Sequence, residues 1–217
     1  MELKGKKVNF LGDSITFGVG ASDFDHSYSQ VMKRLYGLAE ARAYGVSGSR
    51  YVRQMSEGDE PPVRIDFCHR ATEMDRDADV VIVFGGTNDF GYGTIPQGIF
   101  EDRDDDTFYG ACHTLYRYLI ATYPDAVIAV CTPPHSIDEL VGRDGVTYRH
   151  GNLDSFVAII REVAGYYGLP VIDLYASIGF QPFTEDSRAR FMPDGIHPND
   201  AGAERIARRI GNFLLSY

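Results

Sequence analysis

A serine near the amino terminus stands where a nucleophile could act. Ser14 lies in Gly12-Asp13-Ser14, directly after a short apolar run. Gly12 permits a sharp turn where the run ends, and a helix that opens there has first N–H groups without helical partners. A hydroxyl in this position is exposed beside hydrogen-bond donors, as a nucleophile that generates an oxyanion requires. A serine that only caps a helix has the same placement, so this segment alone leaves both roles open.

A carboxylate and an imidazole stand three residues apart near the other end of the chain. Asp194 and His197 are separated by Gly195 and Ile196, and a predicted final helix follows. The glycine allows the chain to bend so that the Asp194 carboxylate reaches Nδ1 of His197. Such a contact fixes the tautomer and supports the charge that a general base gains. A histidine between two prolines also has a purely structural interpretation.

Two further segments could supply hydrogen-bond donors. Gly48 follows the second apolar run, and its backbone N–H could face a pocket with no side chain in the way. Asn88 follows the strongest apolar run, and its amide could donate to a developing negative charge. A plain turn at Gly48 and an Asx turn at Asn88 are the ordinary alternatives. Together, however, the four segments offer a nucleophile, a base, an orienting acid and donors, which no set of separate structural roles predicts.

This combination resembles the conserved blocks of the SGNH/GDSL hydrolases. The nucleophile, glycine, GxND and DxxH blocks of that family are matched in order by Ser14, Gly48, Asn88, and the pair Asp194 and His197. The resemblance implies a three-layer α/β/α sandwich with a five-stranded parallel sheet, which is flavodoxin-like. It also implies an oxyanion hole made by the backbone N–H groups of Ser14 and Gly48 and the side chain of Asn88.

The resemblance further implies a mechanism that needs no metal or other cofactor. His197 would take the proton of Ser14 as the hydroxyl attacks an ester carbonyl, and water activated by His197 would release the acyl-enzyme. We expect a small acyl ester, such as an O-acetylated sugar, as substrate. A lysophospholipase, a thioesterase or an acyltransferase would use the same residues. A non-catalytic sugar-binding module is the alternative of a different class, and the intact Ser14, Asp194 and His197 argue against it.

The elements that must position these residues can be predicted from hydrophobic patterning. Short apolar runs, typical of buried strands, occur at 7–11, 41–45, 80–84, 126–131 and 170–174. Apolar residues recur at helical spacing between them, and Asn199 or Asp200 is placed to cap a last helix. Alternating strands and helices predict a parallel sheet covered on both faces, with ligands bound at the carboxyl ends of its strands.

The bulk composition sets the class of protein and of partner. A chain of 217 residues with 44% hydrophobic and 24% charged residues fits one folded domain over residues 1–217. Its formal net charge of -10 disfavours nucleic acids and anionic membranes and suits a neutral small molecule better. The resemblance implies a small-molecule ester as partner, and the oligomeric state stays open. The first apolar segment is too short for a signal peptide or a membrane span, so we expect a cytoplasmic protein.

The remaining motifs have structural interpretations. Cys68, Cys112 and Cys131 are widely spaced, which predicts free thiols rather than a zinc site or disulfides. The run 102–106 is acidic but lacks the glycine of a calcium loop, and we expect it to be a solvated acidic loop. Long loops are predicted at 56–62, 90–106 and 132–152, and we expect them to shape the pocket.

Overall fold

Five parallel strands form the centre of the molecule. The computed structural model describes residues 1–141 and 151–217. Its sheet has the strand order β2-β1-β3-β4-β5, and the strands are β1 (Lys7–Gly12), β2 (Glu40–Gly45), β3 (Val80–Phe84), β4 (Val127–Cys131) and β5 (Val171–Ile172). The chain turns to opposite sides of the sheet after β1 and β3, and ligands of open parallel sheets bind at such a point. The predicted α/β fold is confirmed.

The predicted strands agree with the observed ones except at the last. The first four match to within one residue at either end, although Asn9 interrupts the apolar pattern of β1 and Arg42 that of β2. The run 170–174 was expected to be one strand, and that expectation is wrong beyond Ile172. The Asp173 side chain accepts a hydrogen bond from the N–H of Ala176, and this cap starts α8 (Leu174–Ser177).

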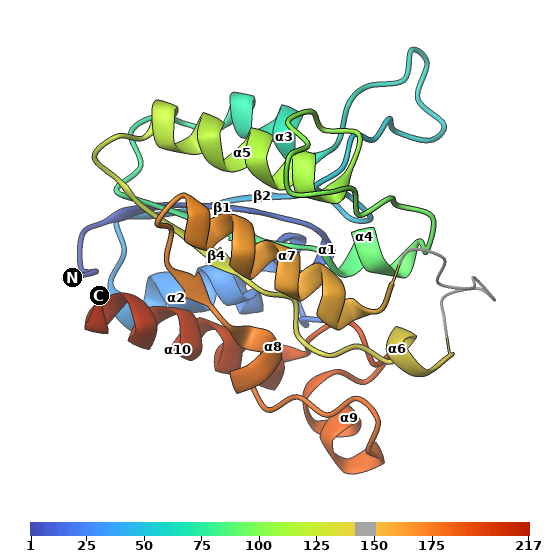
Figure 1. The fold of residues 1–217 in the computed structure, drawn as a ribbon. Coiled ribbons are helices and arrows are strands. Elements are labelled where there is room, and N and C mark those ends of the chain that lie inside the picture. The colour runs from blue at the N-terminus through green and yellow to red at the C-terminus, as the bar shows by residue number, and fades with distance from the viewer. Residues whose placement is uncertain (142–150) are drawn as a thin grey trace.

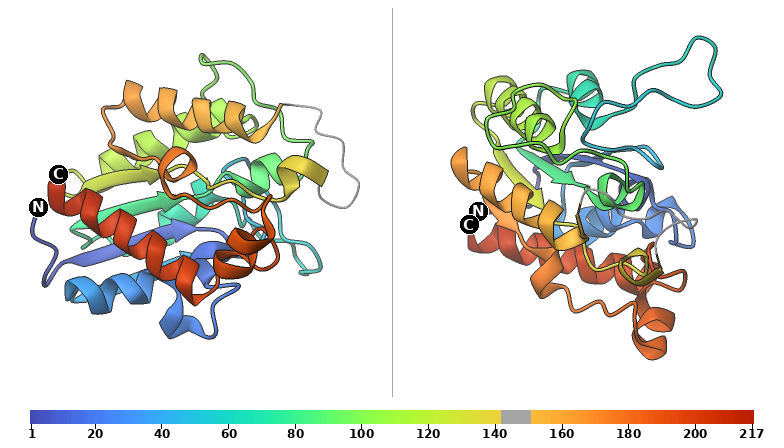
Figure 2. Two further views of the ribbon diagram at one scale, coloured as in Figure 1. Left: turned by 90° about the horizontal axis from the view of Figure 1, so that it is seen from below. Right: turned by 45° about the vertical axis from the view of Figure 1, so that its right-hand side comes forward.

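Helices cover both faces of the sheet (Figures 1 and 2). Alternate residues of a strand point to opposite faces, and in β3 Val81 and Val83 join one core while Ile82 and Phe84 join the other. The first core is closed by α3 (Phe67–Arg70), α5 (Phe108–Thr122) and α7 (Leu153–Tyr166). The second is closed by α1 (Ser14–Phe17), α2 (Tyr28–Tyr36), α8 and α10 (Asp200–Ser216).

Short elements complete the connections. They are η1 (Phe24–His26), η2 (Ala71–Glu73), α4 (Thr87–Gly91), α6 (Asp138–Val141) and α9 (Glu185–Phe191). Of the two predicted caps of α10, Asn199 is the one that caps, because its side chain accepts from the N–H of Gly202. No helix in residues 1–141 and 151–217 has the length and apolar character that crossing a bilayer requires. All three cysteines are free, as expected.

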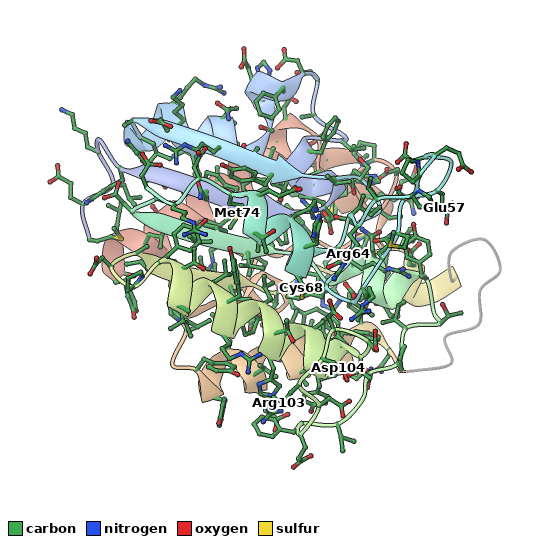
Figure 3. All side chains as sticks on the ribbon, turned by 90° about the horizontal axis from the view of Figure 1, so that it is seen from above. Glu57, Arg64, Cys68, Met74, Arg103 and Asp104 are labelled. Atoms are coloured by element: carbon green, nitrogen blue, oxygen red, sulfur yellow. The ribbon has the colours of Figure 1, made fainter. Side chains whose placement is uncertain are left out.

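The three predicted long loops have different outcomes. Residues 56–62 form the tip of a projecting arm, residues 54–65, whose two sides pair through Ser56 N to Val63 O and Ile65 N to Gln54 O. Figure 3 places Glu57 on this arm and Arg64 nearer to the body. The loop expected from residue 90 begins later, because α4 ends at Gly91. The stretch 132–152 contains α6, and its part 142–150 lies outside the described residues.

Candidate active site

The turn after β1 presents Ser14 at the carboxyl edge of the sheet. The Asp13 side chain accepts from the N–H of Ile15 at 3.0 Å and caps α1, so that Ser14 becomes its first residue. The N–H of a first helical residue is not used in the helical hydrogen-bond pattern. A side chain at Gly12 would place Cβ 2.0 Å from Oγ1 of Thr16, so only glycine fits beneath this turn. The local sequence therefore fixes both the position of the hydroxyl and the donor beside it.

His197 lies against Ser14 and is held by Asp194. The Nε2 atom of His197 is 2.9 Å from Oγ of Ser14, and its Nδ1 atom is 2.6 Å from Oδ2 of Asp194. The other carboxylate oxygen accepts from the backbone N–H groups of Ile196 and His197 at 2.9 and 2.7 Å. Gly195 has φ +82°, which allows this tight turn. The carboxylate thus shapes the loop and orients the imidazole at the same time.

The charge of Asp194 is maintained by the same contacts. Burial acts to raise the pKa of Asp194, but the hydrogen bonds from the His197 imidazole and from the two backbone N–H groups outweigh it. The result is a pKa of about 2. The carboxylate therefore remains ionised from weakly acidic to alkaline pH, and it can stabilise a positive imidazole.

Tertiary contacts bring the two ends of the chain together. Ser14 and His197 are 183 positions apart in the sequence. The N–H and the hydroxyl of Ser22 donate to the two carboxylate oxygens of Asp200 at 2.7 and 2.9 Å. Gly20 lies so close to His197 that a Cβ there would be 2.9 Å from the Cβ of His197. The segment after α1 is thereby joined to the start of α10, and the hydroxyl is aligned with the imidazole.

Gly48 and Asn88 line the same cavity as Ser14, and they lie in the turns that follow β2 and β3. The N–H of Ser49 donates to the carbonyl of Val46, and this turn places Gly48 at φ +77°. Asn88 stands in the first turn of α4, and its amide donates to the carbonyl of Ser49 at 3.0 Å. Gly45 has a different role, because a Cβ there would lie 2.2 Å from the backbone of Phe17 in α1. Of these two glycines, Gly48 lines the cavity that contains Ser14, and its role as the site glycine stays a prediction.

A cleft of about 410 Å³ collects all the predicted residues except Asp194, which stands behind His197. It is lined by Ser14, Val19, Ser47, Gly48, Asn88, Ile196 and His197. Only 8% of Ser14 is exposed, so the hydroxyl is reached through this cleft. The arrangement brings a hydroxyl, an imidazole, a carboxylate and amide donors close together. These are the groups that acyl transfer through a serine requires.

The family assignment follows from comparison with known sequences. The model of the GDSL-like Lipase/Acylhydrolase family matches residues 10–205. The chain belongs to this family. The resemblance inferred from Ser14, Gly48, Asn88 and His197 is confirmed. No curated protein matches this GDSL-like acylhydrolase by sequence.

Solved structures share the fold of this chain. The acylhydrolase is 28% identical to a protein from Lactobacillus plantarum, with a TM-score of 0.84 over 99% of this chain and 98% of that one. It is 20% identical to the lipase/acylhydrolase from Enterococcus faecalis, with a TM-score of 0.67 over 96% and 95% of the two chains. It is 19% identical to the acetyl xylan esterase AlAXEase, with a TM-score of 0.62 over 96% and 99%. The fold is therefore shared along the whole chain.

A second cavity of the acylhydrolase adjoins the cleft. Its volume is about 320 Å³, and it shares Ser47 and Gly48 with the cleft. Its wall is polar and comes largely from the arm; the lining residues are Val46, Ser47, Gly48, Gln54, Ser56, Glu57, Asp59, Ile65 and Tyr92. Sequence analysis did not predict this cavity, because it exists only where the arm approaches the turn after β2.

Asp89 is a buried residue near the site that sequence reasoning did not single out. Its carboxylate accepts from the N–H groups of Tyr51 and Val52, both at 3.1 Å. Burial raises the pKa of Asp89 to about 7, against the opposing effect of these hydrogen bonds. Asp89 follows Asn88 directly and so ties the turn after β3 to the segment after Gly48. The GxND block was the available signal, and its last residue could have been included.

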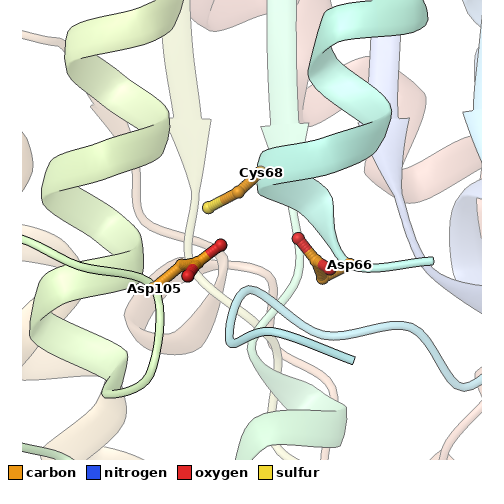
Figure 4. Close-up of side chains that lie close together, drawn as sticks. All are labelled: Asp66, Cys68 and Asp105. Carbon is orange, nitrogen blue, oxygen red and sulfur yellow. The ribbon is translucent and has the colours of Figure 1, made fainter. Parts of the chain in front are cut away.

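An acidic cluster lies beneath the arm and corrects one prediction. Figure 4 shows Asp66, Cys68 and Asp105 converging, with their potential ligand atoms within 4.8 Å of one another. Asp105 belongs to the run expected to be solvated, yet only 7% of it is exposed. It bonds to the guanidinium groups of Arg53 and Arg64, and Arg64 also bonds to Asp66 at 2.8 Å. The solvated-loop prediction is wrong for Asp105, because ion pairs compensate its burial.

The chemistry of this cluster is that of a structural ion-pair network. The two arginines already neutralise both carboxylates. Burial raises the pKa of the Cys68 thiol well above its usual range, and its sulfur lies 3.5 Å from the carbonyl of Ala111. A protonated thiol is a poor metal ligand. The network instead fastens the base of the arm to the loop before α5.

Proposed function

We propose that this GDSL-like acylhydrolase is a serine esterase that cleaves a small acyl ester without a metal. The observation that carries the proposal is the continuous chain from Ser14 Oγ through His197 to Asp194, with contacts of 2.9 and 2.6 Å. These are the distances at which a base removes a proton from a hydroxyl and an acid orients that base.

The reaction proceeds in two halves. Ser14 Oγ attacks the ester carbonyl while its proton moves to Nε2 of His197, and Asp194 stabilises the imidazolium. The imidazolium then returns the proton to the leaving alcohol, and an acyl group remains on Ser14. A water molecule loses a proton to Nε2 and attacks the acyl carbon. Collapse of that intermediate breaks the bond to Ser14 Oγ and releases the carboxylic acid, and the imidazolium returns its proton to Oγ. The catalytic groups of each step come from the chain, and water is the co-substrate.

The negative oxygen of each tetrahedral intermediate needs donors placed in advance. The N–H of Ser14 is not engaged in the helical pattern, and Gly48 and the carboxamide of Asn88 line the same cleft. The hydrogen bond from Asn88 to the carbonyl of Ser49 restricts the orientation of that amide. Donors held in this way strengthen their interaction with the oxygen as charge develops, which lowers the barrier.

The surroundings of the cleft support a short acyl group and a polar alcohol. A long acyl chain would need a continuous apolar groove. The cavity that extends from the cleft is instead lined by Gln54, Ser56, Glu57 and Asp59. Hydroxyl groups of a carbohydrate would find hydrogen-bond partners there. The acetyl xylan esterase among the proteins of the same fold is consistent with an O-acetylated carbohydrate as substrate.

Covalent labelling tests the proposal. A fluorophosphonate should label the wild-type protein, and Ser14→Ala should abolish both labelling and hydrolysis of p-nitrophenyl acetate. Ser47→Ala is the matched control, because Ser47 lines the same cleft and should leave both intact. A panel of esters that varies acyl length and alcohol separately tests the substrate. Full activity in Ser14→Ala would refute the serine mechanism, and faster turnover with longer acyl chains would favour a lysophospholipase or thioesterase.

A further inference from the structure

A buried arginine lies beneath the cleft, outside the set of residues that carry the proposed chemistry. Arg70 is the last residue of α3, and only 6% of it is exposed. Its guanidinium makes four hydrogen bonds, and they go to the carbonyls of Ile65, Tyr44 and Gly12 at 2.8, 2.6 and 2.9 Å and to Oγ of Ser49 at 2.8 Å. Burying a guanidinium costs free energy unless its N–H groups have hydrogen-bond acceptors.

Two of these acceptors end the neighbouring strands β1 and β2. Gly12 is the last residue of β1 and stands two positions before Ser14. Tyr44 is next to last in β2, and the turn that contains Gly48 follows. A guanidinium is a planar, rigid group, so donors that hold both carbonyls fix the distance between the two strand ends. The nucleophile and the glycine donor therefore share one anchor.

The contact with Ser49 reaches the turn that contains Gly48. Arginine can only donate, so Oγ of Ser49 accepts from Arg70 and directs its own hydrogen to the carbonyl of Val46 at 2.7 Å. This bond closes the turn that holds Gly48. The backbone carbonyl of Ser49 in turn accepts from the amide of Asn88. Arg70 is thus connected, through Ser49, to Gly48 and Asn88, two of the three donors proposed for the oxyanion.

The guanidinium is a permanent donor at neutral pH. Burial lowers the pKa of Arg70 to about 10, against the attraction of Asp13 and Asp66. The group remains a cation, and hydrogen bonds from a cation are stronger than those from a neutral donor. The contacts of Arg70 therefore persist over the whole range in which the His197 base would operate.

We propose that Arg70 is a positioning residue for the oxyanion hole, which sets Gly48 and Asn88 relative to Ser14. The proposal rests on the proposed esterase function. Donors for an oxyanion act only within a narrow range of distances, and a displacement of about 1 Å can reduce a rate by roughly 100-fold. Removing the anchor should therefore lower kcat, while KM, which depends on the substrate before the charge forms, should change little.

The test compares two replacements of Arg70 with a control on β2, the strand whose Tyr44 carbonyl accepts from Arg70. Arg70→Met removes the donors, and Arg70→Lys keeps a charge but places three donors on one nitrogen, which cannot serve four separated acceptors. Arg42→Met is the control, because Arg42 is ion-paired with Glu40 and Asp77 near the other end of β2. All three variants lose contacts of an arginine, but only two lose the anchor beneath the cleft.

The measurement must separate positioning from folding. Complete titration with a fluorophosphonate gives the concentration of active sites, and kcat per titrated site is then compared. We expect a fall of about 10- to 100-fold in both Arg70 variants with KM within about threefold, and equally weaker inhibition by a boronic acid that forms a tetrahedral adduct. In Arg42→Met these values should equal those of the wild type. Values per site unchanged in the Arg70 variants would show that Arg70 only stabilises the fold.

A milder variant covers the case in which the Arg70 replacements reduce the yield of folded protein. Ser49→Ala keeps the guanidinium and removes only its link to the carbonyl of Val46. It should lower kcat per site about three- to tenfold, since one of several contacts is lost. No change in Ser49→Ala would overturn the proposal. An active Ser14→Ala, in contrast, would refute the esterase mechanism itself, so the two failures can be distinguished.

Discussion

Replacing Asp194 by asparagine separates the two tasks of this carboxylate. One oxygen of Asp194 accepts from the N–H groups of Ile196 and His197, and the other accepts from Nδ1 of His197 at 2.6 Å. In Asp194→Asn the amide oxygen can keep the backbone contacts, so the loop retains its shape. The amide nitrogen then faces Nδ1 as a donor, and the imidazole must place its hydrogen on Nε2. In that tautomer Nε2 cannot accept the proton of Ser14.

The size of the effect follows from the geometry. The Ser14 Oγ to Nε2 distance of 2.9 Å should persist, because the backbone around His197 is unchanged. Activity is therefore lost because the imidazole has the wrong tautomer and not because the distance changes. In a serine protease triad the equivalent change lowers kcat by about 10⁴. We expect a fall of roughly 10³ to 10⁴ here, equivalent to about 4 to 5.5 kcal/mol in the activation free energy. The thermal midpoint should move little, since Asp194 is partly exposed and its turn is preserved.

The assay is p-nitrophenyl acetate hydrolysis near pH 7.5, with kcat expressed per site titrated by a fluorophosphonate. Asp186→Asn is a suitable control, because Asp186 is an exposed residue of α9 in the preceding segment. It should leave kcat unchanged. A kcat of Asp194→Asn within tenfold of the wild-type value would refute the reasoning, since another group would then be orienting the imidazole.

Three further predictions concern the turn glycine, the buried acid and the arm. Gly48→Ala should lower kcat by about 100-fold, because φ is +77° and the new Cβ would lie 3.2 Å from the Tyr92 hydroxyl; Gly58→Ala, with φ +83° but open space around it, should not. Burial raises the pKa of Asp89 to about 7. Between about pH 4 and 7 the folded state therefore binds more protons than the unfolded state, so the stability of the protein falls as pH rises through that range. In urea unfolding, the free energy of unfolding of the wild type should be lower at pH 8 than at pH 5 by roughly 3 kcal/mol. This difference should be absent in Asp89→Asn. An equal loss in both proteins would contradict the assignment. Arg64→Met should lower the free energy of unfolding, measured by chemical denaturation, by about 3 kcal/mol, because the buried Asp105 loses an ion-pair partner. The kcat per site should stay the same, and a matching fall in kcat would instead connect the arm to catalysis.

Local patterns were sufficient to predict most of the sheet and to select the candidate site residues. The strand at 80–84 was predicted at its true bounds, because five consecutive apolar residues can be satisfied only by burial on both faces. Ser14 and Asn88 could be recognised because each follows such a strand, and the carboxyl ends of parallel strands meet at one edge. The prediction of the last strand was wrong beyond Ile172, because the Asp173 side chain caps a helix within the apolar run that predicted a strand.

Contacts between distant segments were decided only by the tertiary structure. Asp105 looked like one member of a solvated acidic run, and its burial depends on Arg53 and Arg64, some 40 to 50 residues earlier. Arg70 carried no signal at all, because its four acceptors are backbone carbonyls and a hydroxyl that only packing brings together. The sequence by itself determined which residues could react and which segments would be strands, since residue type and periodicity act locally. The alignment of those residues was decided by packing, because hydrogen bonds and ion pairs depend on the positions of groups in space and not on their order in the chain.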